Sequence, residues 1–540
     1  MHGKQLRLYL TMGFFTALLI LFANLGFAAG APVQITTNSA NQGRPDVHGN
    51  IIVWKDIRAG NWDIYMYNLG GGGEQVVANT TAYQNVPATN GMMVVWQDDR
   101  NGSQDVYMRD VFLGIEQPLV TGAGNQGMPE ISGNTVIYVD DQSGNNDIYS
   151  VDLATRTTQP AQPVCTNSAS QWQPRISGSR VVWEDDRNGN WDIYMMDLAT
   201  GSEQQVSTSP GDNKVADISG DIVVWQNVVG GVADIRMKKN IVTGAEQVVT
   251  GVEQAVTSDA AYQNSPRIGG DLIVWEDYRN SNWDIYKKDL TSGEESPLAS
   301  GTSTQARPAV DREKVVYEDT RGGSYDVWMD IVPDITPPVI SAQSPANGQH
   351  TGCVSPVLSA SFSDNRVGVD SHTAHLTLDG QDVTSDATIT GNSISYQPGT
   401  LAIGQHSATL SVADLSGNIA NSSWQFYTSS LELGLNVLEA YWENYADYNS
   451  RELSVPFQLL NVSTDTPAWS VKILTSTATA GVILTTPPVE ISDISPGAHK
   501  DFVLKYLIPP NTNSFKTAIY SSVSDSCGVT SFFPGPPPGE

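Results

Sequence analysis

The sequence predicts an all-β protein: a seven-bladed β-propeller closed by an N-terminal strand, followed by two β-sandwich domains. A segment of the type "VVWEDDRNGNWDIYMMDLATG" (residues 181–201) recurs seven times between residues 32 and 332. Successive copies lie 42 to 50 residues apart, which is the usual length of a four-stranded propeller blade. From residue 339 onward, short β-rich runs alternate with Asp/Asn/Gly turns, a pattern typical of two-sheet sandwiches.

Every repeat contains an aromatic marker, followed nine residues later by an aspartate. The markers are Trp54, Trp96, Tyr138, Trp183, Trp225, Trp275 and Tyr317. The aspartates are Asp63, Asp105, Asp147, Asp192, Asp234, Asp284 and Asp326. Because this spacing is constant while the rest of the repeat varies in length, we interpret the segment as a hairpin around a polar "DRNGN" turn. One strand before it and one strand after it complete a blade of four strands.

The two ends of the repeat array predict how the ring closes. Six repeats are followed by a fourth strand, but the seventh runs from "YDVWMDIV" directly into Pro333. An unattached strand of the missing kind, "VQITTNS" (residues 33–39), precedes the first repeat. We therefore expect the N-terminal strand to complete the last blade, because this pairing removes two exposed sheet edges.

The residues "DDRNGNWDIYMMDLATG" resemble the TolB-type propeller repeat, and the resemblance covers about residues 32–332. It implies a propeller fold. TolB proteins carry a separate α/β domain before a six-bladed propeller, and this sequence matches neither feature. The resemblance therefore implies no role in the Tol envelope system, and propellers host many unrelated functions.

Residues 1–28 have the features of a secretory signal peptide. Lys4 and Arg7 precede an apolar stretch from Leu8 to Phe27, and Ala28 offers a small residue for cleavage. The stretch is also long enough to serve as an uncleaved anchor. In both cases we expect the remaining chain to be secreted or displayed at the cell surface.

Composition limits the classes of partner. The chain has 58 acidic and 29 basic residues, so it should repel nucleic acid and anionic membranes, and we expect membrane contact only through an uncleaved N-terminal segment. Its three cysteines, Cys165, Cys353 and Cys527, lie in different predicted domains and define no disulfide framework. A bridge between Cys353 and Cys527 stays open at this point.

The second half of the chain divides into further segments. Residues 333–338 form a Pro-rich linker, and residues 339–428 resemble the Ig-like modules of prokaryotic surface proteins through "FSDNRVGVD" and "VADLSGNIA". Residues 431–530 are predicted to form another β-rich domain, and residues 531–540 a Pro-rich tail. The stretch "LEAYWENYADY" (residues 438–448) allows a short helix, because it lacks a clear alternation of apolar residues.

The best candidate for a ligand-binding site is the face where each outer strand crosses to the next inner strand. A glutamine stands three residues before the proline of the inner strand in six repeats, and aromatic residues nearby vary between repeats. Amide groups beside aromatic faces suit peptides or sugars, whereas glutamines that bond only to their own loops are the structural alternative. The candidate residues are Gln42, Tyr83, Gln84, Gln126, Gln171, Trp172, Tyr262, Gln263 and Gln305.

Two sets of oxygen-rich turns could bind calcium. The "DDRNGNWD" turns offer several oxygen ligands, but their arginines favour an Asp/Arg hydrogen-bond network that locks each hairpin. In the Ig-like segment, calcium binding and ordinary turn chemistry use the same residue types. The candidate ligands there are Asp364, Asn365, Asp370, Asp414 and Asn418.

No catalytic motif is apparent. The sequence contains no G-x-S-x-G, no H-E-x-x-H and no Gly-rich phosphate loop. We therefore expect a noncatalytic binding, adhesion or scaffold protein that needs no cofactor and recognises an extracellular or envelope protein, a peptide or a glycan. A carbohydrate-active lyase or hydrolase, acting through paired carboxylates, and a purely structural envelope protein are the alternatives.

Overall fold

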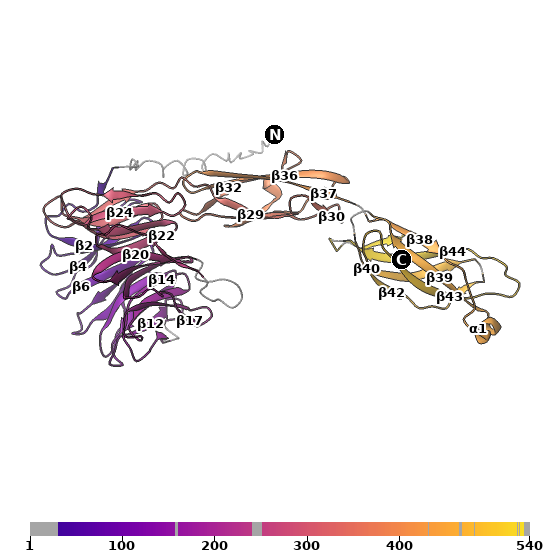
Figure 1. Ribbon diagram of the computed structural model, residues 1–540, viewed down its shortest axis with the longest axis horizontal. Coiled ribbons are helices and arrows are strands. Elements are labelled where there is room, and N and C mark those ends of the chain that lie inside the picture. Colours follow the sequence, from indigo (N-terminus) through magenta and orange to yellow (C-terminus); the bar gives the residue numbers. More distant parts are fainter. Residues whose placement is uncertain are drawn as a thin grey trace, which may run out of the picture. The chain divides into compact units, whose positions relative to one another are not determined.

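The computed structural model describes residues 31–156, 160–239, 251–429, 431–463, 467–479, 481–525, 527–528 and 530–533. The chain divides into two compact units, Met1–Asp334 with Asn365–Val367, and Ile335–Asp364 with Gly368–Glu540. Nearly all described elements are β-strands (Figure 1), which confirms the predicted all-β class. The predicted signal peptide lies outside the described residues, as do residues 534–540 of the predicted tail.

Residues 33–331 contain, in their described part, seven four-stranded antiparallel sheets. Their strands are β1 (Val33–Gln34), β2 (Gln42–His48), β3 (Ile51–Asp56), β4 (Asp63–Asn68), β5 (Gly73–Ala78), β6 (Gln84–Thr89), β7 (Met93–Asp98), β8 (Asp105–Asp110), β9 (Glu116–Val120), β10 (Gln126–Ser132), β11 (Thr135–Asp140), β12 (Asp147–Asp152), β13 (Gln162–Cys165), β14 (Gln171–Ser177), β15 (Arg180–Asp185), β16 (Asp192–Asp197), β17 (Ser202–Gln205), β18 (Asp212–Ser219), β19 (Ile222–Val229), β20 (Val232–Lys238), β21 (Glu253–Ala255), β22 (Gln263–Gly269), β23 (Leu272–Asp277), β24 (Asp284–Asp289), β25 (Glu295–Ala299), β26 (Gln305–Asp311), β27 (Lys314–Asp319) and β28 (Asp326–Ile331).

These sheets form a closed ring. The first strand of each sheet contacts the first strand of the next, from β2 through β6, β10, β14, β18, β22 and β26 back to β2. The seventh sheet has the order β1-β28-β27-β26, so its outer strand comes from the N-terminal end of the described chain. A ring of four-stranded sheets is the arrangement of a β-propeller.

The aromatic markers form the core between neighbouring sheets. Trp183 is fully buried and packs with Ile137, Ile148 and Val164 of the preceding sheet. Its ring stacks on Tyr194 of its own sheet at a centroid distance of 6.4 Å. Each sheet therefore buries apolar side chains on both faces, which explains why both alternate sets of residues in these strands are apolar.

A buried aspartate, paired with an arginine, holds the hairpin together in five of the seven described sheets. In the fourth sheet, Asp185 Oδ2 accepts from Trp183 Nε1 (3.1 Å) and from Arg187 Nη2 (2.6 Å), while Asp185 Oδ1 accepts from Arg187 N (3.0 Å). Arg187 also bonds to Glu203 (2.6 Å) and lies over the Tyr194 ring. The predicted Asp/Arg network is therefore present. The same aspartate–arginine ion pair recurs as Asp56–Arg58, Asp98–Arg100, Asp277–Arg279 and Asp319–Arg321.

The first strand of each sheet is its inner strand, and its pairing with the second strand is interrupted by a β-bulge or similar irregularity. The pairing of the first two strands shifts register in all seven sheets, as between Gly43 and Asp46. One non-glycine residue at each shift has a positive φ, with values from 47° to 51°. These residues are Arg44, Val86, Met128, Gln173, Val215, Ser265 and Arg307. Each shift turns backbone groups away from the regular ladder.

In three sheets, a glutamate of the preceding sheet accepts the N–H of this bulged residue. Glu318 Oε1 accepts from Arg44 N, Glu184 Oε1 from Val215 N, and Glu276 Oε1 from Arg307 N, each at 2.7 Å. All three glutamates stand one residue after the aromatic marker. This contact links three of the seven pairs of neighbouring sheets.

The described residues of the second unit form two pairs of sheets. Residues 339–428 form the sheets β29-β31-β35-β34 and β30-β37-β36-β32-β33, which share one hydrophobic core, and residues 433–533 form β38-β39-β43-β41 and β42-β40-β44-β45 around another. The elements are β29 (Val339–Ser344), β30 (Gln349–Thr351), β31 (Leu358–Ser363), β32 (Val369–Leu378), β33 (Gln381–Asp382), η1 (Thr384–Asp386), β34 (Thr388–Ile389), β35 (Ser393–Tyr396), β36 (Gly404–Asp414), β37 (Ile419–Thr428), β38 (Leu433–Val437), α1 (Tyr445–Ser450), β39 (Glu452–Asn461), β40 (Ala468–Ala478), β41 (Ile483–Leu484), β42 (Val489–Ile494), β43 (His499–Leu507), β44 (Thr517–Ser524) and β45 (Thr530–Phe533).

Two open questions of the sequence are answered in this unit. Cys353 and Cys527 form a disulfide, whereas Cys165 is free and buried. The helix allowed over residues 438–448 begins only at Tyr445, because Asn444 caps it by accepting from Asp447 N (3.0 Å). Before that cap, Tyr441 pairs with Ser454 in a β-bridge.

Candidate functional site

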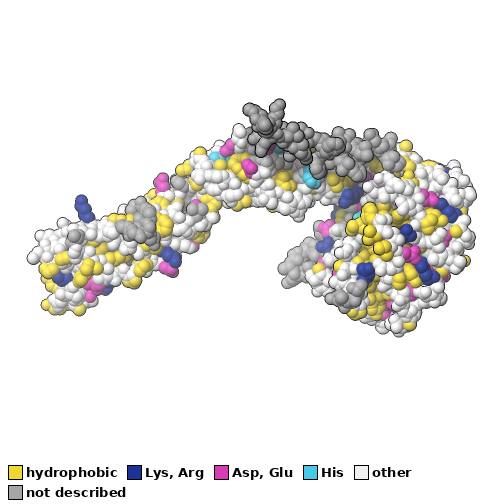
Figure 2. Space-filling view, turned by 180° about the vertical axis from the view of Figure 1, so that it is seen from behind, with side chains coloured by type: hydrophobic (Ala, Val, Ile, Leu, Met, Phe, Trp, Pro, Cys, Tyr) yellow, Lys and Arg dark blue, Asp and Glu magenta, His cyan; other side chains and the backbone are white. Residues whose placement is uncertain are grey.

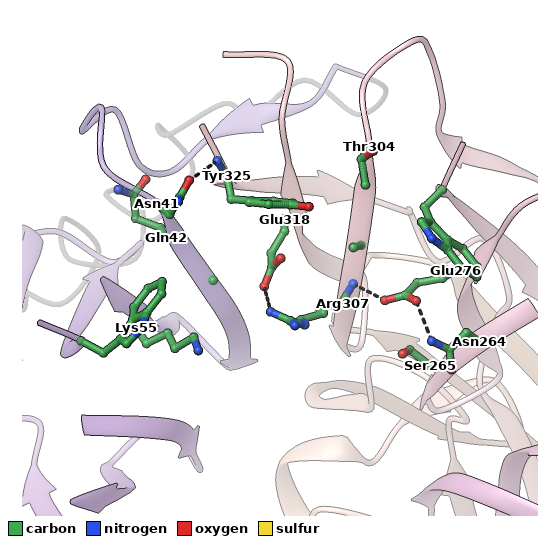
Figure 3. Close-up of a pocket in the computed structure, with 14 residues that line it drawn as sticks. Asn41, Gln42, Lys55, Asn264, Ser265, Glu276, Thr304, Arg307, Glu318 and Tyr325 are labelled. Carbon is green, nitrogen blue, oxygen red and sulfur yellow. Dashed lines mark hydrogen bonds and ion pairs between the residues drawn. The ribbon is translucent and has the colours of Figure 1, made fainter. Parts of the chain in front are cut away.

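A cavity of about 570 Å³ opens at the end of the ring where the inner strands begin (Figure 3). This is the end at which the sequence predicts ligand binding. The cavity lies between the first, sixth and seventh sheets, and we call it the mouth cavity. It is lined by Asn41, Gln42, Gly43, Lys55, Trp62, Asn264, Ser265, Glu276, Trp283, Thr304, Ala306, Arg307, Glu318 and Tyr325.

Three aromatic side chains line the mouth cavity: Trp62, Trp283 and Tyr325. Each stands directly before the constant aspartate that begins the third strand of its sheet. Trp283 is held by edge contacts with Tyr262 and Tyr278, at centroid distances of 6.1 Å and 5.1 Å. The Trp283 ring is therefore held in place by two neighbouring tyrosines, as is usual in a preformed ligand site.

Two buried glutamates in the cavity wall are engaged by hydrogen bonds. Glu318 accepts from Arg44 N (2.7 Å) and from Arg307 Nη1 (3.0 Å). Glu276 accepts from Arg307 N (2.7 Å) and from Asn264 Nδ2 (3.0 Å), and burial raises the pKa of Glu276. A side chain at residue 43 would meet Glu318 Oε1 at 2.7 Å, so Gly43 permits this close approach of the carboxylate to β2.

Lys55 supplies an amine to the cavity. Its Nζ lies 4.2 Å from the centroid of the Trp62 ring. Burial, together with the positive charges of Arg44 and Arg307, lowers the pKa of Lys55 to about 8, although the Glu318 carboxylate acts in the opposite direction. In Figure 3, Lys55 and Arg307 extend into the space between their sheets from different sides.

The structure places the six predicted glutamines at the first residue of their inner strands, where all are fully buried. Their amide nitrogens bond to their own loops: Gln84 to Ala82 O (2.9 Å), Gln171 to Ala169 O (2.7 Å), and Gln305 to Ser303 Oγ (2.6 Å). Gln42 lines the mouth cavity, whereas Gln84, Gln126, Gln171, Gln263 and Gln305 do not. Ligand binding by this set stays a prediction.

Of the predicted aromatic residues, Tyr262 supports the mouth cavity through Trp283. Tyr83 is 58% exposed and Trp172 is partly exposed, but neither lines the cavity. The structure thus brings one of the three predicted aromatic residues next to the cavity wall.

The divergent fifth repeat keeps its hairpin by a different set of bonds. Asn213 stands where the other inner strands have glutamine, and its Oδ1 accepts from Trp225 Nε1 and from Asn227 Nδ2, both at 3.0 Å. An amide pair therefore replaces the aspartate of the other sheets. Arg236 of the same repeat pairs with Glu253 at 3.6 Å.

The predicted calcium ligands of the second unit stabilise their own turns. Asp414 Oδ1 accepts from Asn418 N (2.8 Å) and its Oδ2 from Asn418 Nδ2 (2.7 Å), and Asp370 Oδ1 accepts from His372 N (3.1 Å). Oxygens of Asp364 and Asp414 lie within 4.8 Å of each other. Asn365 groups with the first unit instead. Calcium binding at these residues stays a prediction.

Sequence reasoning missed most of the residues that line the mouth cavity. Trp62, Trp283 and Tyr325 share one position of the repeat, which holds Gln104, Asn146, Trp191 and Ala233 in the other sheets. Lys55, Glu276 and Glu318 share another position. Variation within an otherwise constant segment was the signal that could have identified both positions.

Although acidic residues outnumber basic ones two to one, basic residues far apart in the sequence meet at this end of the ring. Arg44 and Arg307 lie close enough to Lys55 to contribute to the lowering of its pKa. Elsewhere on the face of the first unit seen in Figure 2, acidic and basic side chains are interspersed.

None of the helices in the described part of the chain has the length and apolar character of a membrane span. No protein-family model matches the sequence, and no curated protein matches it.

Several solved structures are similar to the chain. One is TolB from Acinetobacter baumannii, with 17% identity and a TM-score of 0.35, covering 46% of this chain and 62% of that chain. Another is the β-propeller domain of the Trilobed protease from Pyrococcus furiosus, with 14% identity, a TM-score of 0.42, and coverage of 55% and 98%. An oligogalacturonate lyase in complex with manganese has 12% identity, a TM-score of 0.43, and coverage of 57% and 95%. These similarities concern the fold and assign no activity to this chain.

Proposed function

We propose that the chain is an exported, noncatalytic recognition protein that binds an extracytoplasmic protein, peptide or glycan in the mouth cavity. In this proposal the seven sheets are the blades of one propeller closed by β1. The two modules of the second unit are β-sandwich spacers, the first of them Ig-like.

The mouth cavity is the observation that carries this proposal. Its volume of about 570 Å³ lies within the range of small-ligand sites. Its wall combines the rings of Trp62, Trp283 and Tyr325 with the polar groups of Asn41 and Thr304. Such a wall can hold a ligand by ring contacts and orient it by hydrogen bonds.

A carboxylate pair in the cavity favours the second candidate, a carbohydrate-active enzyme, because Glu276 and Glu318 both line the wall. However, each carboxylate accepts the N–H of a bulged residue in the next sheet. Glu184 makes the same contact with Val215 N outside the cavity, and burial raises the pKa of Glu184 to about 7. The repetition of the contact supports an architectural role for these glutamates.

Replacing Trp283 by alanine is expected to weaken ligand binding by about 10- to 100-fold, because it removes one aromatic wall. Residues 29–540 would first be applied to glycan and cell-surface protein arrays to identify a ligand. Affinity for that ligand would then be measured by calorimetry with the wild-type chain and with Trp283→Ala.

The matched control is Trp191→Ala. Trp191 occupies the same repeat position in the fourth sheet but does not line the mouth cavity, so its removal should leave the affinity unchanged. Equal affinities of the wild type and Trp283→Ala would contradict the proposed site. Turnover of a bound glycan that disappears in Glu276→Gln would favour the enzyme instead.

A further inference from the structure

Lys55 departs from the architecture of the repeat. The position one residue after the aromatic marker holds glutamate in three sheets, Glu184, Glu276 and Glu318, and each accepts the bulge N–H of the next sheet. Lys55 cannot accept this bond. The N–H of Val86 is bonded by Asn85 Oδ1 instead (3.0 Å). In the first repeat, a cation that lines the mouth cavity thus stands where three other repeats have a glutamate acceptor.

This cation has no acidic partner. Among the ion pairs of the described residues, none involves Lys55, and its ring contact is with Trp62. A partly buried ammonium group without a carboxylate is unfavourable, since burial penalises its charge. The lowered pKa of Lys55 is the expected consequence.

The carboxylates of the cavity wall are already engaged by the protein. The charged residues that line the cavity are Lys55, Arg307, Glu276 and Glu318. Both carboxylates accept two hydrogen bonds from the protein, and Arg307 forms an ion pair with Glu318 at 3.0 Å. Lys55 is thus the cation of the described wall that has no ion pair, and a ligand that brings a negative group would supply one.

The remaining wall favours a saccharide over an extended peptide. A peptide that adds to a sheet edge needs a regular strand, but β2, β22 and β26 all break register at the cavity, with positive φ at Arg44, Ser265 and Arg307. The other lining groups are indole and phenol rings, side-chain amides and hydroxyls. Rings and amides of this kind suit the ring faces and hydroxyl groups of sugars.

We propose that the mouth cavity binds a carboxylate-bearing saccharide of the uronic-acid class, with its carboxylate between Lys55 and Arg307 and its sugar ring against Trp283 or Tyr325. This inference rests on the proposed function and names its ligand class.

The test compares a short oligomer of glucuronic acid with the same oligomer after reduction of its carboxyl groups. Calorimetry on residues 29–540 should show binding of the acidic oligomer and much weaker binding of the reduced one. Lys55→Glu should weaken binding of the acidic oligomer by about 100-fold or more, because it replaces a charge-assisted bond by repulsion. This variant restores the residue type of three other sheets, so we expect it to fold, and Lys55→Gln gives a neutral second variant.

Lys214→Glu is the matched control. Lys214 also lies over a tryptophan of the repeat, with its Nζ 5.6 Å from the centroid of Trp191, but it pairs with Asp212 and does not line the mouth cavity. Its reversal should leave binding unchanged. Unchanged binding in Lys55→Glu, or failure of every uronic-acid oligomer in a panel to bind, would overturn the inference.

The same experiment separates this inference from the proposed function. Binding of a neutral glycan that depends on Trp283 but not on Lys55 would leave the proposed function standing and refute the acidic ligand. Binding of an acidic peptide, with no binding of uronic-acid oligomers, would refute the saccharide class. Absence of every ligand would refute both.

Binding of the acidic oligomer should weaken as the pH rises through about 8. The carboxylate interacts with protonated Lys55 and raises the pKa of Lys55 in the complex, so affinity is full below the pKa of the free protein and falls above it, at most about tenfold per pH unit. The charged groups that act on Lys55 are Arg44 on β2, Arg307 on β26 and Glu318 on β27. Glu276 on β23 lines the same cavity.

The control for this pH dependence is Lys55→Arg. Its affinity for the acidic oligomer should be the same below and above pH 8, because arginine stays charged. An identical pH profile for the wild type and Lys55→Arg would exclude Lys55 as the titrating group.

Discussion

Replacement of Trp183 by alanine should lower the free energy of unfolding of the first unit by about 3 to 5 kcal/mol. The Trp183 side chain is fully buried between the third and fourth sheets. Its loss leaves a cavity lined by Ile137, Ile148 and Val164, which strands paired on both sides cannot collapse to fill. The Nε1–H that satisfies one oxygen of Asp185 is lost as well.

Denaturant-induced unfolding monitored by circular dichroism would measure this loss, with the transition of the first unit analysed separately. Trp191→Ala removes the same side chain from a partly exposed turn of the same sheet, so we expect a loss of about 1 kcal/mol or less. Equal unfolding midpoints for the wild type and Trp183→Ala would mean that the intersheet core does not depend on the marker.

The second large effect is expected for Asp185→Ala, at about 3 to 5 kcal/mol. The Asp185 carboxylate is fully buried and accepts bonds from Trp183 Nε1 and from three nitrogens of Arg187. These bonds, together with the bond that Arg187 donates to Glu203, hold the pKa of the Arg187 guanidinium above its ordinary range. Without Asp185, a partly buried cation and a buried indole N–H lose their acceptor.

The neighbouring variant Asp186→Ala serves as the control for this prediction. Asp186 accepts from Ser170 N (2.8 Å), and its loss should cost about 1 kcal/mol. The double variant Asp185→Ala/Arg187→Met should be more stable than Asp185→Ala alone, because it removes the unpaired charge. If Asp185→Ala and Asp186→Ala destabilise equally, the carboxylate of Asp185 is not the centre of the hairpin network.

Sequence reasoning succeeds for contacts that are local and repeated. The marker and the aspartate two residues later lie in one strand, so the bond between Trp183 and Asp185 recurs in the four sheets that have both tryptophan and aspartate at these positions. The constant spacing from marker to aspartate is likewise a local property, and the hairpin that it predicts is present in the structure. The outer position of β1 followed from the count of strands alone.

The candidate site shows the opposite case. The glutamines recur at one position of the repeat because each bonds to its own loop, as Gln171 does through Ala169 O. This recurrence led to the prediction that they bind a ligand. The lining residues vary between repeats, and only three of the seven sheets contribute to the cavity. A motif averaged over seven copies hides such differences.

The sequence by itself determined the all-β class, the repeat length, the hairpin with its Asp/Arg network, and the strand available to close the ring. Each depends on residues a few positions apart, where strand geometry and turn chemistry act directly. Only the tertiary structure decided which side chains form the mouth cavity. It also places Lys55 near Arg44 and Arg307, and it engages the Glu318 carboxylate with the N–H of Arg44. The pairing of Cys353 with Cys527 is likewise a result of the tertiary structure. The physical reason is that ring closure places β2 beside β26 and β27, although these strands lie at opposite ends of the repeat array. Electrostatic interactions depend on distance in space and not on distance along the chain.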